Sequence, residues 1–516
     1  MKRCALLLLA AGLFLQAASP VAAVDFSVKG QWMMAFGIAE NSLTKHIRDT
    51  AGRRQARRED TFAAQQRIFL QLDATASERL SGSVFLHIGP QQWGRGVNGG
   101  ALGADGTVVK VRNAFIDWIV PESELKIRMG ISSLTLPNAA GGSAVFDTRT
   151  AGIIATYSLT EQVGISALWM RPFNDNFPGA AYHSDDAALY LDNMDLFGLM
   201  LPLRFDGATV TPWVLYGMMG RNAMKFSDNM TNSLTDGYPA VSLFPWLNRA
   251  EGGNGLNVVS FDDTSKSYGS LFWLGLPAKI TAFDPWNIEF DFNYGFVAGM
   301  GRADVLRRNN KADIVRASSQ RQGWLAKALI EYRADWGVPG IFGWYASGDD
   351  GNVRNGSERL PSLCPYGSFT SYLGDGNEHW GPSLSYFDHA LSYAGTWGIG
   401  VQLRDISLLE DLKHTLRVVW WGGTNAPGMV QYMDRAYAWD STFMRADGPY
   451  LTTRDGLLEV NAVTVWQVYE NLQANLELGY VANFMDGATW KKSYADWGSY
   501  SRQDMWKAQV LFKYSF

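Results

Sequence analysis

The sequence predicts an all-β protein: a transmembrane antiparallel β-barrel of about 18 strands (about 16 being the alternative), with short periplasmic turns and long extracellular loops. Three observations support this prediction. Segments of about ten residues recur in which every second side chain is apolar. Short and long connections alternate between these segments, and aromatic residues concentrate at the segment ends.

The first 23 residues have the pattern of a secretory signal peptide. A basic start is followed by an apolar run over 5–15 and a small-residue cleavage site at 21–23. The run is shorter than the about 20 residues that a spanning helix needs, which argues against a membrane anchor. We therefore expect a signal peptide, 1–23, and one barrel domain, 24–516.

Composition is consistent with many strands and turns. Aromatic residues make up 13% of the chain, with 20 Trp and 53 Gly, while charged residues reach only 18%, below the roughly 25% of soluble domains. Removal of the signal's two basic residues changes the formal net charge from −5 to −7, which gives no support for nucleic-acid binding. Cys364 is then the only cysteine, so a disulfide within the chain is excluded.

About 18 segments fit the strand pattern, with ends placed to within about three residues. They are 25–37, 63–75, 80–89, 107–120, 123–131, 149–158, 162–171, 192–205, 207–218, 267–277, 286–298, 322–334, 339–348, 394–405, 411–422, 456–468, 472–482 and 504–516. Beyond residue 23 no stretch has the length and apolarity of a spanning helix, so a chain embedded in a membrane must cross it as strands.

The connections between these segments differ in length in a regular way. The long ones are polar and rich in Gly, Asn and Asp: 38–62, 90–106, 132–148, 172–191, 219–266, 299–321, 349–393, 423–455 and 483–503. Short turns at one end and long loops at the other are typical of outer-membrane barrels. A closed barrel of about 18 strands is too wide for side chains to fill. We therefore expect the polar face of each strand to line a wet lumen and the apolar face to contact lipid.

Polar residues on the predicted inner face suggest a charged pore. The basic candidates are on early strands: Lys29, Arg67, Lys126, Arg128, and with them Lys110 and Arg112. Lys110 and Arg112 share the even register with Ala114, Ile116 and Trp118, so their strand needs a bulge if both bases point inward. The alternative is scattered, solvated lumenal charges. The acidic candidates are Glu289, Asp291, Glu331 and Asp147.

The third long connection, 132–148, is compact, rich in small residues and weakly charged. It is a candidate to fold into the lumen and narrow it, and the alternative is an external loop. The residues that we single out are Ser132, Asn138, Gly141, Gly142, Phe146 and Asp147.

Two further loop features have simple explanations. Closely spaced acids, Asp349 with Asp350 and Asp185 with Asp186, are weak calcium candidates, because the EF-hand spacing is missing and such residues favour turns. The basic run 52–60 suits contact with lipopolysaccharide or a neighbouring subunit better than nucleic acid. No His-Glu-x-x-His, Gly-x-Ser-x-Gly or phosphate-loop motif occurs, so we do not expect an enzyme.

The signal peptide, the loop rhythm and the ending Tyr514-Ser515-Phe516 together resemble the trimeric outer-membrane porins. The segments "VRNAFIDW" (111–118) and "LKIRMG" (125–130) look like those of the homotrimeric porins of sulfate-reducing bacteria, and more loosely like substrate-preferring 18-stranded porins. The resemblance implies a homotrimer in the outer membrane, passive diffusion of small hydrophilic solutes, and a basic cluster facing the third loop. It also implies that Tyr514 and Phe516 form an assembly signal for the barrel-insertion machinery.

The third loop departs from the general-porin pattern because it is poor in acids, so we expect a mild preference for anions. Three function classes stay open. They are a diffusion porin, a channel specific for a carboxylate, sugar or inorganic anion, and a non-conducting surface barrel that serves as adhesin, receptor or enzyme.

Overall fold

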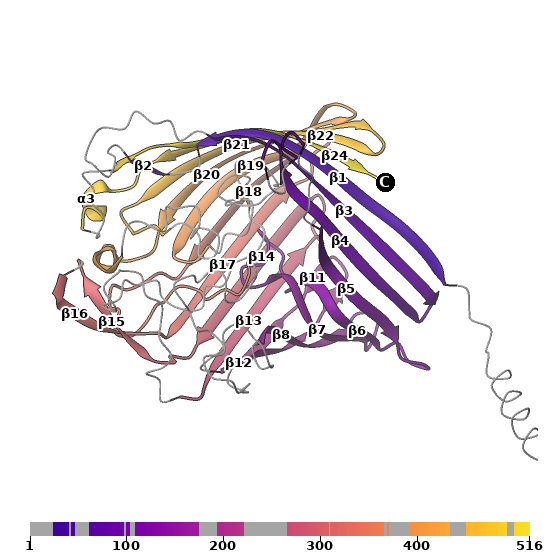
Figure 1. Ribbon diagram of the computed structural model, residues 1–516, viewed down its shortest axis with the longest axis horizontal. Helices are drawn as coiled ribbons and strands as arrows, with labels where there is room; N and C mark the ends of the chain where they lie inside the picture. Colours follow the sequence, from indigo (N-terminus) through magenta and orange to yellow (C-terminus); the bar gives the residue numbers. More distant parts are fainter. Residues whose placement is uncertain are drawn as a thin grey trace, which may run out of the picture.

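The computed structural model describes residues 24–40, 43–46, 61–96, 100–103, 109–174, 193–220, 266–308, 310–365, 369–370, 393–433, 450–492 and 500–516. Most of them belong to one antiparallel sheet that closes on itself (Figure 1). The 20 strands of this sheet make 18 crossings, because β10 continues β9 and β11 continues β12. The predicted fold class is confirmed.

The barrel strands follow one another around the wall in chain order. They are β1 (Asp25–Glu40), β3 (Thr61–Ser77), β4 (Leu80–Gln92), β5 (Val109–Ile119), β6 (Lys126–Thr135), β7 (Asp147–Ser158), β8 (Gly164–Asn174), β9 (Asn193–Met200), β10 (Leu203–Phe205), β11 (Ala208–Val210), β12 (Trp213–Gly220), β13 (Tyr268–Ile280), β14 (Trp286–Val297), β17 (Arg321–Tyr332), β18 (Val338–Ala346), β19 (Thr396–Leu409), β20 (Leu412–Gly423), β21 (Gly456–Tyr469), β22 (Leu472–Asn483) and β24 (Met505–Ser515). Each of the 18 predicted segments overlaps one crossing.

The last strand pairs with the first and removes the sheet's edges. Trp32 lies opposite Tyr514, and Met34 lies opposite Phe512. Beyond β24 the backbone of Phe516 continues the ladder, since its N–H donates to Gly30 O (3.0 Å) and its C=O accepts from Gly30 N (2.7 Å). No unpaired strand edge is then exposed to lipid along this seam.

A bulge in β5 resolves the conflict between its two registers. Phe85 pairs with Asn113 and Leu86 with Val111, so Arg112 is the extra residue. Lys110 then lies opposite His87, and Arg112 stacks over the inward-facing ring of Phe69. The bulge therefore places both bases on the inner face, although the even-numbered residues that follow it in β5 lie on the outer face.

The outer face is apolar over most of the barrel. Side chains such as Val111, Ile153, Ile341 and Val401 alternate with inward residues and are exposed on the outside. Trp286 and Tyr332 form an edge-to-face pair at the short-turn end, with ring centroids 5.1 Å apart. A closed sheet with an apolar, aromatic-bordered exterior is an integral outer-membrane barrel. No helix among the described residues has the length and apolarity to cross a membrane.

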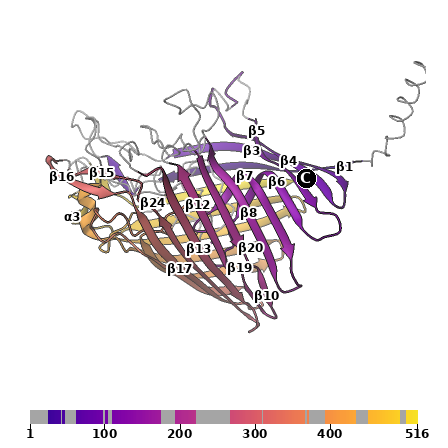
Figure 2. The same cartoon turned by 90° about the horizontal axis from the view of Figure 1, so that it is seen from below.

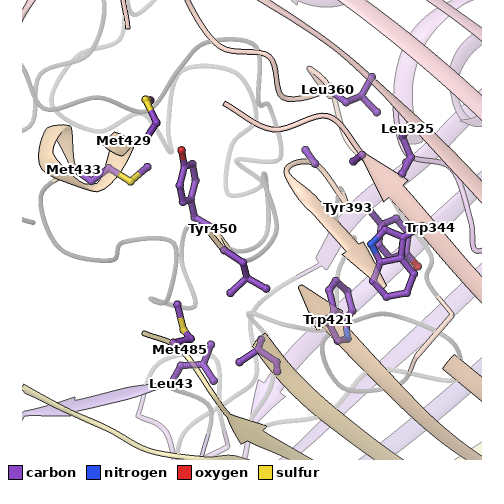
Figure 3. Packing of buried hydrophobic residues seen from close by; sticks show 14 of the residues in the cluster. Leu43, Leu325, Trp344, Leu360, Tyr393, Trp421, Met429, Met433, Tyr450 and Met485 are labelled. Carbon is purple, nitrogen blue, oxygen red and sulfur yellow. The ribbon is translucent and has the colours of Figure 1, made fainter. Parts of the chain in front are cut away.

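The long connections form structure of their own at one end of the barrel (Figures 1 and 2). One small hairpin, one two-stranded sheet and two short helices lie there, none of which the sequence pattern predicted. They are the hairpin β15 (Arg302–Arg307) with β16 (Asn310–Ser318), the pair β2 (Thr44–His46) with β23 (Tyr500–Arg502), the 3-10 helix η2 (Pro427–Tyr432) and α3 (Gly487–Trp490). Residues of the hairpin and of both helices belong to a large apolar cluster that also includes the inner face of β17, β18 and β20 (Figure 3).

The expectation of a uniformly polar inner face is therefore wrong over part of the wall. Trp344, Tyr393 and Trp421 pack ring against ring inside the barrel, with Trp344 and Trp421 centroids 4.5 Å apart. A second inner cluster covers β8, β9, β12 and β13. Loops that fold inward supply the apolar partners, so these inward side chains are buried in protein and not in an empty void.

Candidate functional site

The third long connection lies inside the barrel. Leu136, Val145 and Phe146 are buried in the inner cluster together with Trp213 and Trp273. The indole N–H of Trp213 donates to Pro137 O at 2.9 Å. The loop is therefore held by apolar packing and by polar contacts from the wall.

A buried ion pair holds the tip of this loop. Lys327 Nζ lies 3.2 Å from Asp291 Oδ2, and both side chains are essentially inaccessible to water. The Lys327 ammonium also donates to Gly142 O, while Asp291 accepts a hydrogen bond from the backbone N–H of Ala139. Lys327 and Asp291, on neighbouring strands, thus hold the loop at two points. We call this arrangement the loop latch.

The remaining loop candidates have defined places. Ser132 is buried on the inner register of β6, and Asn138 Nδ2 donates to Leu136 O at 3.2 Å. Gly141 has φ +62°, and a Cβ there would meet the Phe369 ring at 2.8 Å. A side chain at position 141 would therefore be strained in backbone and in space.

A second loop inside the barrel, around residues 362–364, forms hydrogen bonds with the third long connection. Ser362 Oγ donates to Ala144 O at 2.8 Å, and Leu363 N donates to Val145 O at 3.0 Å. Asp147 N in turn donates to Cys364 O at 2.7 Å. The sequence analysis treated this stretch as part of an ordinary long loop, since no motif marks these backbone contacts.

The predicted basic residues lie on the inner face of β1, β3, β5 and β6, where two acids join them. Lys29 Nζ is 3.2 Å from Asp73 Oδ2. Asp117 accepts a bidentate pair from Arg128 (2.7 and 2.8 Å) and lies 3.1 Å from Lys126 Nζ. The sequence analysis missed Asp73 and Asp117, although both occupy the inward register of their strands.

An aromatic patch adjoins these bases. The guanidinium carbons of Arg67 and Arg112 lie 4.8 and 4.9 Å from the centroid of the Phe69 ring. Phe85 and His87 flank the same ring, with centroids 5.3 and 4.8 Å away. The inner face of β3–β5 therefore combines cations with apolar rings.

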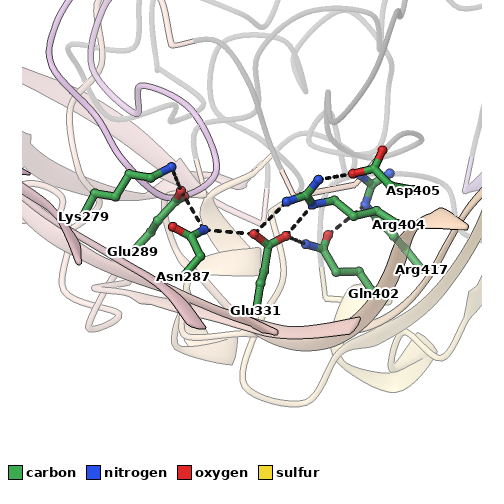
Figure 4. A network of polar contacts seen from close by, with 8 residues as sticks. All are labelled: Lys279, Asn287, Glu289, Glu331, Gln402, Arg404, Asp405 and Arg417. Atoms are coloured by element: carbon green, nitrogen blue, oxygen red, sulfur yellow. Dashed lines mark hydrogen bonds and ion pairs between the residues drawn. The ribbon is translucent and has the colours of Figure 1, made fainter. Parts of the chain in front are cut away.

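Most of the predicted acidic residues are neutralised by neighbours. Glu289 Oε1 is 2.8 Å from Lys279 Nζ, and Asn287 bridges Glu289 to Glu331 (Figure 4). Glu331 also accepts from Arg404 and from Gln402 Nε2 at 2.8 Å. Arg417 Nε extends the network to Gln402 at 3.2 Å.

In three lumenal ion pairs the base is clearly the more exposed partner. Side-chain exposure is 63% for Lys29 against 20% for Asp73, and 47% for Lys126 against 15% for Asp117. It is 44% for Lys279 against 12% for Glu289. Arg404 is 33% exposed against 2% for Glu331, but it also pairs with Asp405, which is 42% exposed. Lumenal water at the three lysine pairs therefore meets positive charge first.

Asp147 differs from its predicted position. It pairs with Thr135, whose hydroxyl donates to Asp147 Oδ1 at 2.7 Å, on the register that also holds the outward-facing Ile131 and Ile153. The prediction that Asp147 lines the pore is wrong. The residue is already part of β7, which starts at residue 147, and the alternation of the strand turns its side chain outward.

The acid clusters that suggested calcium have other partners. Asp349 accepts from Ser357 Oγ (2.6 Å) and Tyr450 Oη (2.7 Å). Asp350 accepts from the backbone of Asn352 at 2.7 Å. Asp185, Asp186 and the run 52–60 lie outside the described residues. Within the described ranges no three His, Cys, Asp or Glu side chains gather in a way that could hold a metal ion.

Comparisons with known proteins find similar folds but no close relative. No protein-family model and no curated protein matches the chain. Among solved structures, the outer membrane protein OprD of Pseudomonas aeruginosa is 12% identical, with 97% of this chain and 96% of that chain covered and a TM-score of 0.48. OpdQ of the same organism is 10% identical, with coverage of 95% and 98% and a TM-score of 0.47. Similarity of this degree concerns the fold alone.

Proposed function

We propose that the protein is an outer-membrane channel for passive diffusion of small hydrophilic solutes, with a mild preference for anions. The observation that supports the preference is the order of exposure in three ion pairs, in which Lys29, Lys126 and Lys279 are each turned to water more than the acid beside them. Charged walls of one sign raise the local concentration of the opposite ion. A threefold preference corresponds to only about 0.65 kcal/mol, well within the reach of such partly exposed charges.

The test is the reversal potential of the purified protein in planar bilayers under a salt gradient. We expect an anion-selective sign, which moves toward zero in Lys126→Gln. Lys491→Gln is the matched control, because Lys491 is an exposed lysine that follows α3 outside the barrel. A cation-selective wild type, or an equal change in the control, contradicts the proposal.

A substrate-specific channel is the second candidate, and the patch around Phe69 favours it. Arg67 and Arg112 stack on one ring, which suits a solute with an anionic group and a flat apolar body. Flux that saturates with such a solute, and loses saturation in Phe69→Ala, would support this candidate over simple diffusion. Absence of single-channel conductance would favour a non-conducting surface barrel instead.

The expected partners belong to the same proposal. The barrel works as a homotrimer, its wall contacts lipid and lipopolysaccharide, and the insertion machinery reads Tyr514 and Phe516. The narrower resemblance of 111–118 and 125–130 to porins of sulfate-reducing bacteria stays a prediction, as does calcium at the acid clusters.

A further inference from the structure

One sector of the outer wall lacks the aromatic border that the rest of the barrel carries. On the outward register of β5–β7 the aromatic residues are Trp118 and Tyr157, and both lie at the short-turn end. The border is still present next to β4, where Trp93 packs edge-to-face on Phe36 with ring centroids 5.2 Å apart. On the opposite wall Tyr294 pairs with Trp324, which stacks on Tyr345 with centroids 5.5 Å apart. Aromatic side chains there mark the outer lipid boundary.

Polar side chains take the place of those aromatic residues on β6 and β7. Ser133 and Arg149 form one outward cross-strand pair, and Thr135 and Asp147 form the next. We call the outward face of β5–β7, with these four residues at its upper part, the polar sector.

Arg149 lies at a depth in the membrane where contact between its charged side chain and lipid is unfavourable. Tyr157 and Arg149 share the outward register of β7, eight positions apart, which is about 26 Å along a strand and about 20 Å of height at a tilt of about 40°. The apolar band of such barrels is about 25 Å tall. Arg149 therefore lies in the outer-leaflet part of the band, at the level where β14 carries Tyr294.

We infer that the polar sector is the face through which this chain packs against further copies of itself. Opposite charges on β7 allow Asp147 of one copy to pair with Arg149 of the next copy around a threefold ring, and the small Ala151 below them permits close approach. At the sector's border the outward charge is satisfied within the chain, since Asp195 accepts from Arg171 (2.8 and 3.0 Å) and from Trp169 (2.9 Å). This inference rests on the homotrimer proposed above and names its contact face.

The test places a photo-crosslinking amino acid at Ile153 of the full chain in cells. Val460 on β21 is the matched control, because it is a β-branched residue on the outward register with nearly the same exposure, 41% against 39%. We expect adducts of two copies from position 153 and none from position 460. Adducts from both positions, from neither, or only from 460 overturn the inference, as does an adduct that migrates as a lipopolysaccharide ladder.

A second pair of variants measures the contact without a crosslinker. Ala151→Trp adds a ring to the polar sector, while Ala462→Trp adds one to the far wall. Native mass in detergent should fall to monomer for Ala151→Trp alone. A trimer in both variants refutes the contact face, and a monomeric wild type refutes the oligomer itself. Conductance and reversal potential of the same samples report separately on the proposed channel function.

Discussion

The loop latch allows a sharp prediction about how the inner loop is held. Lys327→Met removes the ammonium that contacts both Asp291 and Gly142 O, and it keeps most of the side chain's volume. Asp291 is then left as a buried carboxylate without its counter-ion. Removal of one partner from a buried pair costs about 3–5 kcal/mol, which is a large fraction of a typical unfolding free energy of about 5–15 kcal/mol.

Two measurements follow from this change. The melting temperature should fall, and single-channel recordings should show larger current fluctuations, because residues 139–142 lose one of their two attachments to the wall. Asp291→Asn with Lys327→Met is the control, since the neutral pair leaves no buried charge and Asn can still accept from Ala139 N–H. We expect the double variant to recover most of the wild-type stability, while its current fluctuations stay larger than those of the wild type. A single Lys327→Met variant with wild-type stability and current noise refutes the reasoning.

Three further outcomes are expected. Gly323→Val should lower the melting temperature of the folded barrel, because a Cβ there would meet the backbone oxygen of Glu358 at 2.4 Å, whereas Gly82→Val should not, since its Cβ would have only an ordinary contact at 3.6 Å. Asp117→Asn should increase anion preference in reversal-potential measurements, because Lys126 and Arg128 lose their shared acid; a shift toward cations would contradict the assignment. Burial, reinforced by the charges of Asp349 and Asp350, raises the pKa of Glu358 from 4.5 to about 7. The folded state then holds more protons than the unfolded state between these values, so stability should fall as pH rises from about 4.5 to about 7, and Glu358→Gln should flatten the pH dependence of melting.

The strands were predictable because a period of two is a property of the local sequence. The β5 bulge was predictable for the same reason, since Lys110 and Arg112 conflict with the register of Ala114 and Ile116 within one segment. The inner apolar clusters were not predicted, although a signal exists. β12 is apolar on both faces, which indicates a lumenal face covered by protein.

The roles of individual inner residues required the structure. Glu289 and Asp291 are two positions apart on the same register of β14, yet Glu289 pairs with a water-exposed lysine and Asp291 with a buried one. The difference comes from a loop 185 residues distant from Lys327 in the chain, whose carbonyl at Gly142 reaches that lysine. Local periodicity contains no information about which loop folds inward or where it stops.

Two kinds of inward lysine therefore exist in this barrel, and they should respond differently to the same substitution. Lys126 is 47% exposed beside Asp117, whereas Lys507 is 2% exposed beside the fully buried Glu477. Apolar clusters bury part of the inner side of β8–β13 and of β17–β22, whereas the basic side chains of β1 and β6 are exposed to lumenal water, as are Lys279 on β13 and Arg404 on β19. A neutral residue at 126 changes the potential in that water and hence selectivity. A neutral residue at 507 leaves a buried carboxylate without its partner, so its effect should appear in stability.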